Sequence, residues 1–291
     1  MNSNLNGAVN SAPTSERALS TTTQSTVVDN NVKPEVNNRY KNVLFDRIPS
    51  VKIPQGIKGK FSDIYIKPAE RYSPVTDEMN LLPKVDLEVF NVEYKPYRIG
   101  ESMEISVPLK RNNPEFVDLI RSEFRDRIEK GLDYYSVFGT GTTQPKGLNS
   151  ITNVNECKIT KAGSTITLAD LQKMVDSIPT HYRYLNGKDN LVWIVSDSNA
   201  QKVSQFITYN QVADRFEILG REVIQVQGDT GTKVIFLANI NFALRKVVFQ
   251  DYIQEDVSED TTNRIKGTET LSEEKWIDVQ LVDELAVRYL V

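Results

Sequence analysis

The sequence has few of the residues that catalysis and cross-linking need. Its 291 residues include one cysteine, Cys157, so an internal disulfide is excluded and a zinc knuckle cannot form. The N-terminus MNSNLNGAVN lacks the basic region and apolar run of a secretory signal, and no apolar run is long enough to cross a bilayer. Lysine and arginine (35) do not outnumber aspartate and glutamate (39). We therefore expect a soluble cytoplasmic product with no membrane partner and no strong grip on nucleic acid.

The glycines in YYSVFGTGTTQPKGL (134–148) raise the question of a phosphate loop. A dinucleotide fingerprint needs GxGxxG directly after a strand, but the third glycine position here is Gln144 and the stretch follows a predicted helix. The pattern GxxxxGK[ST] fits neither this stretch nor GDTGTK at 228–233. We predict a structural turn for the first stretch and a hairpin turn between REVIQV and KVIFLA for the second.

Other catalytic or metal-binding arrangements are equally weak. The single histidine, His181, could pair with Cys157 as a nucleophile and base, although a lone histidine in a loop is usually structural. The acidic run QEDVSED (254–260) lacks the ligand spacing and turn glycine of an EF-hand, which favours a solvated loop. The sequence therefore predicts no catalytic, cofactor-binding or metal-binding residue, no cofactor, and no enzyme.

The first part of the chain divides into an arm and a set of strands. Residues 1–38 contain no aromatic residue and are about half Asn, Ser and Thr, a composition too polar to form a core. KFSDIYI and LEVFNVEY predict strands on either side of a Pro-rich, charged segment at 67–84. This pattern fits an extended hairpin and an ordinary meander equally well. Residues 97–109 alternate with period two and predict one strand of 13 residues.

The period then changes to that of a helix. Asn113 and Pro114 form a helix start, and apolar residues follow at spacings of three and four over about 22 residues. Charged pairs on the other faces indicate a helix that lies across a surface. Further on, residues 166–177 predict a helix, LVWIVS (191–196) predicts a buried strand, and alternation over 277–289 predicts a second long strand, with Asp283 as the exception.

This order of parts, with the helix end YYSVFGTGTTQPKGL as its most specific segment, resembles the major capsid proteins of tailed bacteriophages. IGESMEISVPL before NNPEFVDLIRSEFRDRIEKGLD and the stretch LVWIVSDSNAQKVSQF are similar to segments of the same family. The resemblance implies an α+β chain with the Hong Kong 97-like fold, which has an N-terminal arm, an extended β-hairpin loop, a peripheral domain with a long spine helix, and an α+β axial domain. It covers roughly residues 40–291.

The resemblance also implies a division of the chain and two structural sites. We expect a flexible arm at 1–39, peripheral strands and extended loop at 40–110, spine helix and turn at 111–150, a mainly axial domain at 151–250, and return strands to the peripheral domain at 251–291. The expected structural turn consists of Gly139, Gly141, Pro145 and Gly147. The expected apolar face of the spine helix consists of Phe116, Leu119, Ile120, Phe124, Ile128 and Leu132.

The function implied is that of a major capsid protein, which self-assembles into an icosahedral shell around double-stranded DNA without sequence-specific binding. Its expected partners are many copies of itself in pentamers and hexamers, a portal, and a separate scaffolding protein, with assembly in the host bacterial cytoplasm and final location in the virion capsid. Lys67 and Lys84 are available for a cross-link, but no motif marks a partner Asn, so none is expected. The alternatives are an encapsulin-type compartment shell, against which the polar arm argues, and a cytoplasmic α+β enzyme that uses Cys157 or His181.

Overall fold

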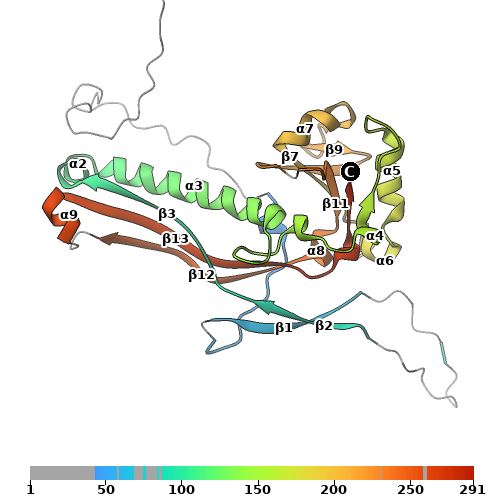
Figure 1. Ribbon diagram of the computed structural model, residues 1–291, viewed down its shortest axis with the longest axis horizontal. Helices are drawn as coiled ribbons and strands as arrows, with labels where there is room; N and C mark the ends of the chain where they lie inside the picture. Colours follow the sequence, from blue (N-terminus) through green and yellow to red (C-terminus); the bar gives the residue numbers. More distant parts are fainter. Residues whose placement is uncertain are drawn as a thin grey trace, which may run out of the picture.

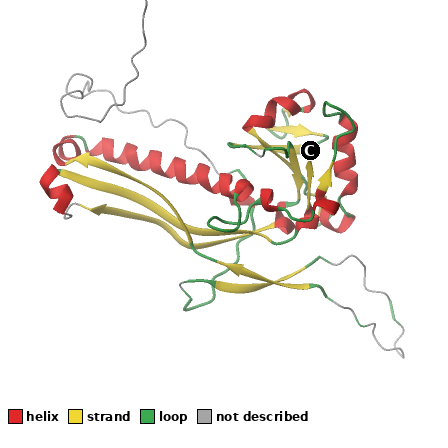
Figure 2. Ribbon diagram, viewed as in Figure 1, coloured by secondary structure: helices red, strands yellow, loops and turns green. Residues whose placement is uncertain are grey.

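The computed structural model describes residues 43–57, 59–68, 75–76, 84, 87–229, 231–257 and 261–291. It has three parts, a long three-stranded sheet with a helix along it, a seven-stranded sheet with short helices around it, and a two-stranded hairpin below both (Figures 1 and 2). The arm predicted over residues 1–39 lies outside the described residues, as does most of the loop predicted between the two hairpin strands.

The hairpin consists of β1 (Phe61–Ile66) and β2 (Val89–Tyr94), which pair with each other alone. The antiparallel register places Phe61 opposite Tyr94 and Ile66 opposite Val89. Both strands predicted from KFSDIYI and LEVFNVEY are confirmed. Because they form a separate two-stranded sheet, the structure favours the extended hairpin over the meander.

The three-stranded sheet has β13 (Thr268–Leu281) at its centre, antiparallel to β3 (Tyr97–Ser106) and β12 (Leu244–Val257). The prediction of one strand over 97–109 is wrong at its end. Ser106 accepts a hydrogen bond from the Leu109 N–H at 3.3 Å, and Pro108 lies in the first turn of the short helix α2 (Val107–Asn112). An N-cap serine and an early proline thus override the alternating pattern.

The long helix α3 (Pro114–Phe138) begins at the proline that the sequence indicated and lies along the three-stranded sheet (Figure 1). Its Ile120 and Phe124 pack with Ile105 of β3 and Leu271 of β13 in a small separate core. The amphipathic spacing therefore fixes which side of the helix meets the sheet.

The seven-stranded sheet has the strand order β4-β14-β11-β7-β10-β9-β8. The predicted hairpin turn at GDTGT is wrong, because β10 (Arg221–Val226) and β11 (Ile235–Ala238) do not pair. The buried strand β7 (Val192–Ser196) lies between them, parallel to β10 and antiparallel to β11. Its Trp193 is completely buried, as expected for a central strand covered on both faces.

The C-terminal prediction of one long strand over 277–289 is also wrong. β13 ends at Leu281, and the Asp283 side chain accepts the Leu285 N–H at 3.1 Å to begin the 3-10 helix η4 (Glu284–Ala286). The last strand β14 (Val287–Leu290) then joins the seven-stranded sheet. The last part of the chain therefore contributes one strand to each of the two larger sheets.

The acidic run predicted as a loop belongs partly to β12, which includes residues 254–257, and residues 258–260 lie outside the described part. β12 also begins at Leu244, so the expected division at residue 250 falls inside a strand of the three-stranded sheet. The helix predicted over 166–177 is confirmed as α5 (Leu168–Ser177), which begins with a capping box formed by Thr167 and Asp170.

The remaining elements are short. They are η1 (Phe45–Arg47), η2 (Leu148–Ser150), α4 (Val154–Cys157), β4 (Lys158–Ile159), α6 (Thr180–Arg183), β5 (Tyr184–Leu185), β6 (Lys188–Asp189), α7 (Asp197–Val203), η3 (Ser204–Phe206), β8 (Thr208–Asn210), β9 (Arg215–Ile218), α8 (Ile240–Ala243) and α9 (Thr261–Lys266). The main core joins both sheets and includes residues from η1, the end of α3 and β13.

Candidate functional site

The chain leaves α3 through the glycine turn that the sequence marked. The Gly139 N–H donates to the Tyr135 carbonyl at 3.1 Å, and the Gly147 N–H donates to the Gly139 carbonyl at 3.0 Å. A Cβ on Gly139 would lie 2.2 Å from the Pro145 carbonyl oxygen, and one on Gly147 would lie 2.6 Å from the Tyr135 carbonyl oxygen. Only glycine therefore permits this close approach of two backbone segments.

The same turn is tied to the centre of the three-stranded sheet. The Lys146 N–H donates to Val279 of β13 at 2.8 Å, and the Leu281 N–H donates back to Lys146 at 2.9 Å. Gly141 has a φ of +79°, and its N–H donates to Pro145 at 3.1 Å. Because the N–H groups of all three turn glycines bond to protein carbonyls, none of them remains to hold a phosphate.

The predicted apolar face of the helix divides between two cores. Ile128 and Leu132 are at most 1% exposed, and Leu132 belongs to the main core. Phe116 packs at the edge of the smaller core that contains Ile120 and Phe124, and Leu119 lines an open groove between α3 and β3. The face thus holds the helix on the sheet and joins the sheet to the rest of the molecule.

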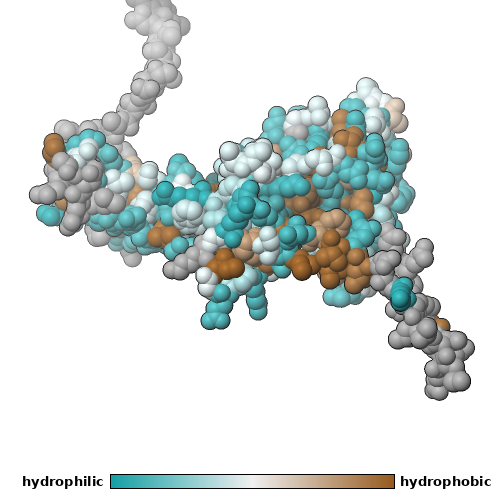
Figure 3. Space-filling view, turned by 60° about the horizontal axis from the view of Figure 1, so that its bottom comes forward, coloured by the Kyte–Doolittle hydropathy of each residue, from teal (hydrophilic) through white to brown (hydrophobic). Residues whose placement is uncertain are grey.

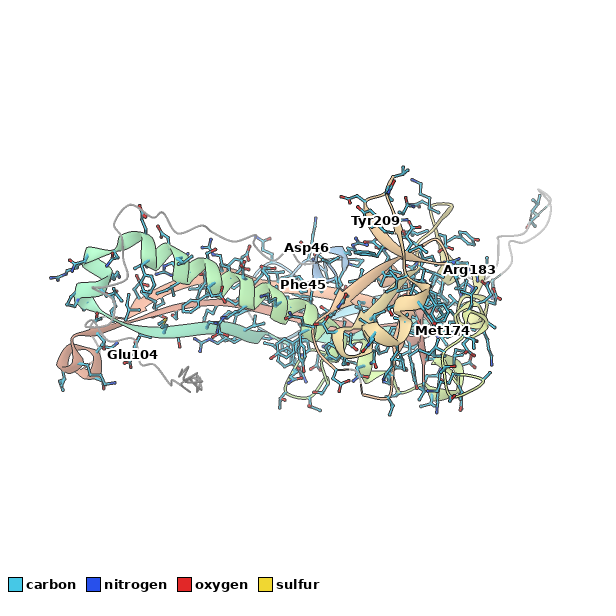
Figure 4. The ribbon with its side chains drawn as sticks, turned by 90° about the horizontal axis from the view of Figure 1, so that it is seen from above. Phe45, Asp46, Glu104, Met174, Arg183 and Tyr209 are labelled. Atoms are coloured by element: carbon cyan, nitrogen blue, oxygen red, sulfur yellow. The ribbon has the colours of Figure 1, made fainter. Side chains whose placement is uncertain are left out.

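A segment that the sequence did not single out crosses the end of α3. We call residues 43–51 the strap. The buried carboxylate of Asp133 accepts the backbone N–H groups of Val43, Leu44 and Phe45 at 3.1, 3.2 and 2.7 Å. The buried Lys246 of β12 donates from Nζ to the Phe45 carbonyl at 2.7 Å (Figure 4 shows Phe45 beside the end of α3). The Asp133 carboxylate therefore binds N–H groups of the strap, and the Lys246 ammonium binds a carbonyl group of the strap.

The base of the hairpin is held by two buried carboxylates. Asp278 of β13 accepts the Lys95 N–H at 2.8 Å, between β2 and β3. Asp283 accepts the Tyr182 hydroxyl at 2.6 Å, and the Tyr65 hydroxyl of β1 lies 3.4 Å from the same oxygen. Burial raises the pKa of Asp278 to about 6 and also raises the pKa of Asp283.

The outer face of the hairpin is apolar and exposed. Ile64 and Ile66 of β1 are 65% and 51% exposed, and Leu87 and Val89 near the start of β2 are 60% and 54% exposed. Ile66 and Val89 are direct cross-strand partners. The side of the molecule that carries the hairpin shows apolar residues gathered on its surface (Figure 3). Contiguous exposed apolar groups of this kind mark a contact surface.

A second exposed apolar group lies at the end of the seven-stranded sheet. Tyr209 of β8 and Phe216 of β9 are cross-strand partners whose ring centres are 5.4 Å apart, and both are more than half exposed. Val212, in the turn between them, is 99% exposed. Tyr209 stands at the rim of this part of the molecule (Figure 4).

The model of the phage capsid family matches residues 68–291, well over half of the chain. The chain belongs to the phage capsid family. It is a major capsid protein, a structural component of the virion shell that assembles with copies of itself. No curated protein matches the sequence.

Solved structures show that this capsid protein has the Hong Kong 97-like fold. It superposes on a chain described as the capsid of an empty GTA particle with a TM-score of 0.68 and 12% identity, over 92% of this chain and 96% of that one. A chain from Mycobacterium phage Bobi gives a TM-score of 0.61 and 11% identity, with the same two coverages. The asymmetric unit of the bacteriophage PhiM1 mature capsid gives 0.51 and 9%, over 87% and 88%. These findings do not support the encapsulin or enzyme alternatives.

The surroundings of Cys157 and His181 in the capsid protein differ from those of a catalytic pair. The Cys157 thiol is fully buried and donates to the Glu284 carbonyl at 3.1 Å, and burial raises its pKa to about 11. A nucleophilic cysteine needs the opposite shift. The His181 ring packs on Tyr182, with ring centres 4.4 Å apart. The structure thus gives the two residues separate, structural surroundings.

Two features typical of other protein classes are missing from the described residues. Within the described ranges, no group of three or more His, Cys, Asp or Glu side chains is placed to hold a metal ion. No helix in the described part of this capsid protein is long and apolar enough to span a membrane.

Sequence reasoning missed the polar residues that join the parts of the capsid protein. Asp133 and Lys246 lie among many charged residues, and no local pattern distinguishes them from solvated ones. Asp278 occupies a polar position in an alternating strand, where an exposed side chain is the ordinary expectation. Only Asp283 gave a signal, because it interrupted the alternation.

Proposed function

We propose that this capsid protein forms an icosahedral shell of pentamers and hexamers that encloses double-stranded DNA. The observation that carries the proposal is the exposed apolar face of the hairpin, formed by Ile64, Ile66, Leu87 and Val89. The hairpin lies below the two larger sheets (Figure 1), and because this face is exposed, a neighbouring copy is the surface that would cover it. In this assignment the hairpin is the extended loop and α3 is the spine helix.

The division into domains follows the two sheets. We assign β3, α3, β12, β13 and the glycine turn to the peripheral domain, and the seven-stranded sheet with its helices to the axial domain. Gly139, Gly141, Pro145 and Gly147 then serve as the structural turn that leads from the spine helix towards the axial domain. Tyr209 and Phe216, at one end of the seven-stranded sheet, would lie in contacts between axial domains.

The remaining partners follow from the charge and from the function. With a net charge of −4, the chain would surround DNA without binding its phosphates strongly. We infer assembly in the host bacterial cytoplasm with a portal and a separate scaffolding protein. We also propose that the chain is not an enzyme, which the buried, high-pKa thiol of Cys157 supports.

Assembly of the expressed full-length chain tests the proposal. Ile64→Asp with Val89→Asp would place two charges in the hairpin face, and we expect the double variant to remain folded but to form few or no shells by electron microscopy and sedimentation. Ile64→Leu with Val89→Leu is the matched control and should assemble as the unaltered chain does. Shells formed equally well by the aspartate variant would refute the hairpin face as a contact between copies.

A further inference from the structure

The joint between the hairpin and the three-stranded sheet contains an incompletely bonded acid. Asp278 is 0% exposed. Its Oδ2 accepts the Lys95 N–H at 2.8 Å and the Gln280 amide at 2.9 Å. Its Oδ1 is buried and has no hydrogen-bond partner among the described residues. A buried ionised oxygen without a partner is costly, so this position favours the neutral form of the acid.

The position of Asp278 links the cost of its buried charge to the base of the hairpin. Lys95 lies directly between the end of β2 and the start of β3, so the bond to its N–H fixes the point where the hairpin leaves the sheet. The adjacent Tyr94 is 1% exposed and packs with Phe61 and Val247. Opening of this joint would expose Asp278 to water and release Lys95.

The groups that face Asp278 compensate its charge only in part, because burial raises its pKa more than the Gln280 amide, the Lys95 and Val279 N–H groups and the Lys95 charge together lower it. Lys95 is the nearby cation, but its side chain is 46% exposed and its ammonium group also lies 3.7 Å from Glu93. The phenols of Tyr94 and Tyr97 also face Asp278, and burial is the main cause that raises the pKa of each. The Asp278 charge is the second cause for Tyr97, whereas for Tyr94 it raises the pKa less than the Asp63 charge does. β12 contributes Val247, an apolar residue directly opposite Asp278.

We propose that Asp278 makes this joint responsive to acid, because protonation holds the base of the hairpin more firmly and ionisation loosens it. The proton comes from solvent and adds to Oδ1, while Lys95 and Gln280 continue to donate to Oδ2. Neutralisation therefore removes the buried charge without breaking an existing hydrogen bond. Asp283, the second buried carboxylate at the hairpin base, bonds to Tyr182 and Tyr65 and not to the Lys95 amide, so exchange of that amide reports on Asp278.

The size of the effect follows from linkage. In the closed joint the pKa of Asp278 is about 6, and in an open joint it would approach the ordinary value of about 3.9. The closed state binds the proton more tightly, so lowering the pH from 7 to 5 should favour closing by about tenfold. The added stability of the closed joint is complete below about pH 4 and is lost as the pH rises through about 6.

Hydrogen exchange of the unassembled full-length chain provides the test. We expect the protection factor of the Lys95 amide, corrected for intrinsic exchange, to rise about tenfold from pH 7 to pH 5. Amides of Ile194 and Val195 in the central strand β7 serve as references in the same molecule. Asp278→Asn should abolish the rise, and Asp118→Asn, which alters an exposed acid on α3, should preserve it. A flat wild-type response, or a rise that persists in Asp278→Asn, would overturn the proposal.

A second measurement needs no variant. Carbon-13 NMR of the aspartate carboxyl groups should show one that titrates near pH 6, and titration of all of them below about pH 5 would also overturn the proposal. The inference concerns the single chain, and only its consequence for contacts between copies rests on the proposed function. Because both measurements use the unassembled chain, a failure to form shells would leave their outcome unchanged.

Discussion

Asp133 of α3 accepts the N–H of Phe45 at 2.7 Å, although the two residues are 88 positions apart. The same carboxylate holds Leu44 and Val43, while Lys246 holds the carbonyl side of Phe45. Leu44 and Phe45 are almost completely buried in the main core. The strap is thus fixed on the end of α3 and the start of β12.

Substitution of Asp133 should therefore destabilise the chain. Asp133→Ala leaves two buried N–H groups without an acceptor, and each such loss costs about 1–3 kcal/mol, so we expect the free energy of unfolding to fall by roughly 3 kcal/mol. Asp133→Asn retains one acceptor oxygen and should lose about half as much. Urea unfolding of the unassembled chain at pH 7 measures both. Ordinary surface substitutions change the free energy of unfolding by up to about 0.5 kcal/mol. A loss no larger than this for Asp133→Ala would contradict the role of Asp133 in holding the strap.

The glycine turn makes an equally sharp prediction. A methyl group on Gly139 would lie 2.2 Å from a backbone oxygen that cannot move without disturbing the bonds to β13, so Gly139→Ala should destabilise the chain by about 3 kcal/mol or more. A methyl group on Gly163 would meet no atom within 4 Å, so this glycine provides the control. Gly163→Ala should be neutral or slightly stabilising, because it restricts the unfolded chain. Equal thermal unfolding temperatures for the two variants would disprove the close approach.

The elements that the sequence predicted well are those with a local cause. The start of α3 at Pro114, the helix α5 and the strands β1 and β2 all follow from spacing or helix-start signals within a few residues. The glycine turn was also recognisable, because its residues and its place after a long helix appear together in the sequence.

The elements that the sequence missed depend on distant partners or on conflicting local patterns. Nothing local to GDTGT indicates that β7, which comes earlier in the chain, inserts between the strands on either side of it. The run 97–109 keeps its alternation through Val107 and Leu109, which hides the cap at Ser106. Asp133 resembles the other charges on a solvated helix, because its partners are backbone groups that carry no sequence signature.

Cys157 should resist thiol reagents in the folded chain. Burial raises its pKa to about 11, so at pH 8 only about one thiol in a thousand is ionised, compared with about a quarter of free thiols. We expect alkylation by iodoacetamide to be at least about a hundredfold slower in the folded chain than in urea. Mass spectrometry of timed samples measures both rates. Rapid alkylation of the folded chain would show that the thiol is accessible and would reopen the enzyme alternative.

Arg125 and Glu273 form a partly buried ion pair under α3. Arg125 donates from Nε to Glu273, whose side chain is 0% exposed and whose second oxygen has no hydrogen-bond partner among the described residues. Arg125→Leu would leave a buried carboxylate unpaired, which costs about 3–5 kcal/mol, whereas Arg125→Leu with Glu273→Leu should recover most of the loss. Arg127→Ala breaks an exposed pair with Glu123 and should cost no more than about 0.5 kcal/mol. Urea unfolding separates these cases, and equal losses for the Arg125 and Arg127 variants would mean that Glu273 reaches water. A large loss of unfolding free energy in Arg125→Leu that the double variant restores would instead show that an apolar contact is as stable as the ion pair at this site. The pair would then serve to fix the register of α3 on β13.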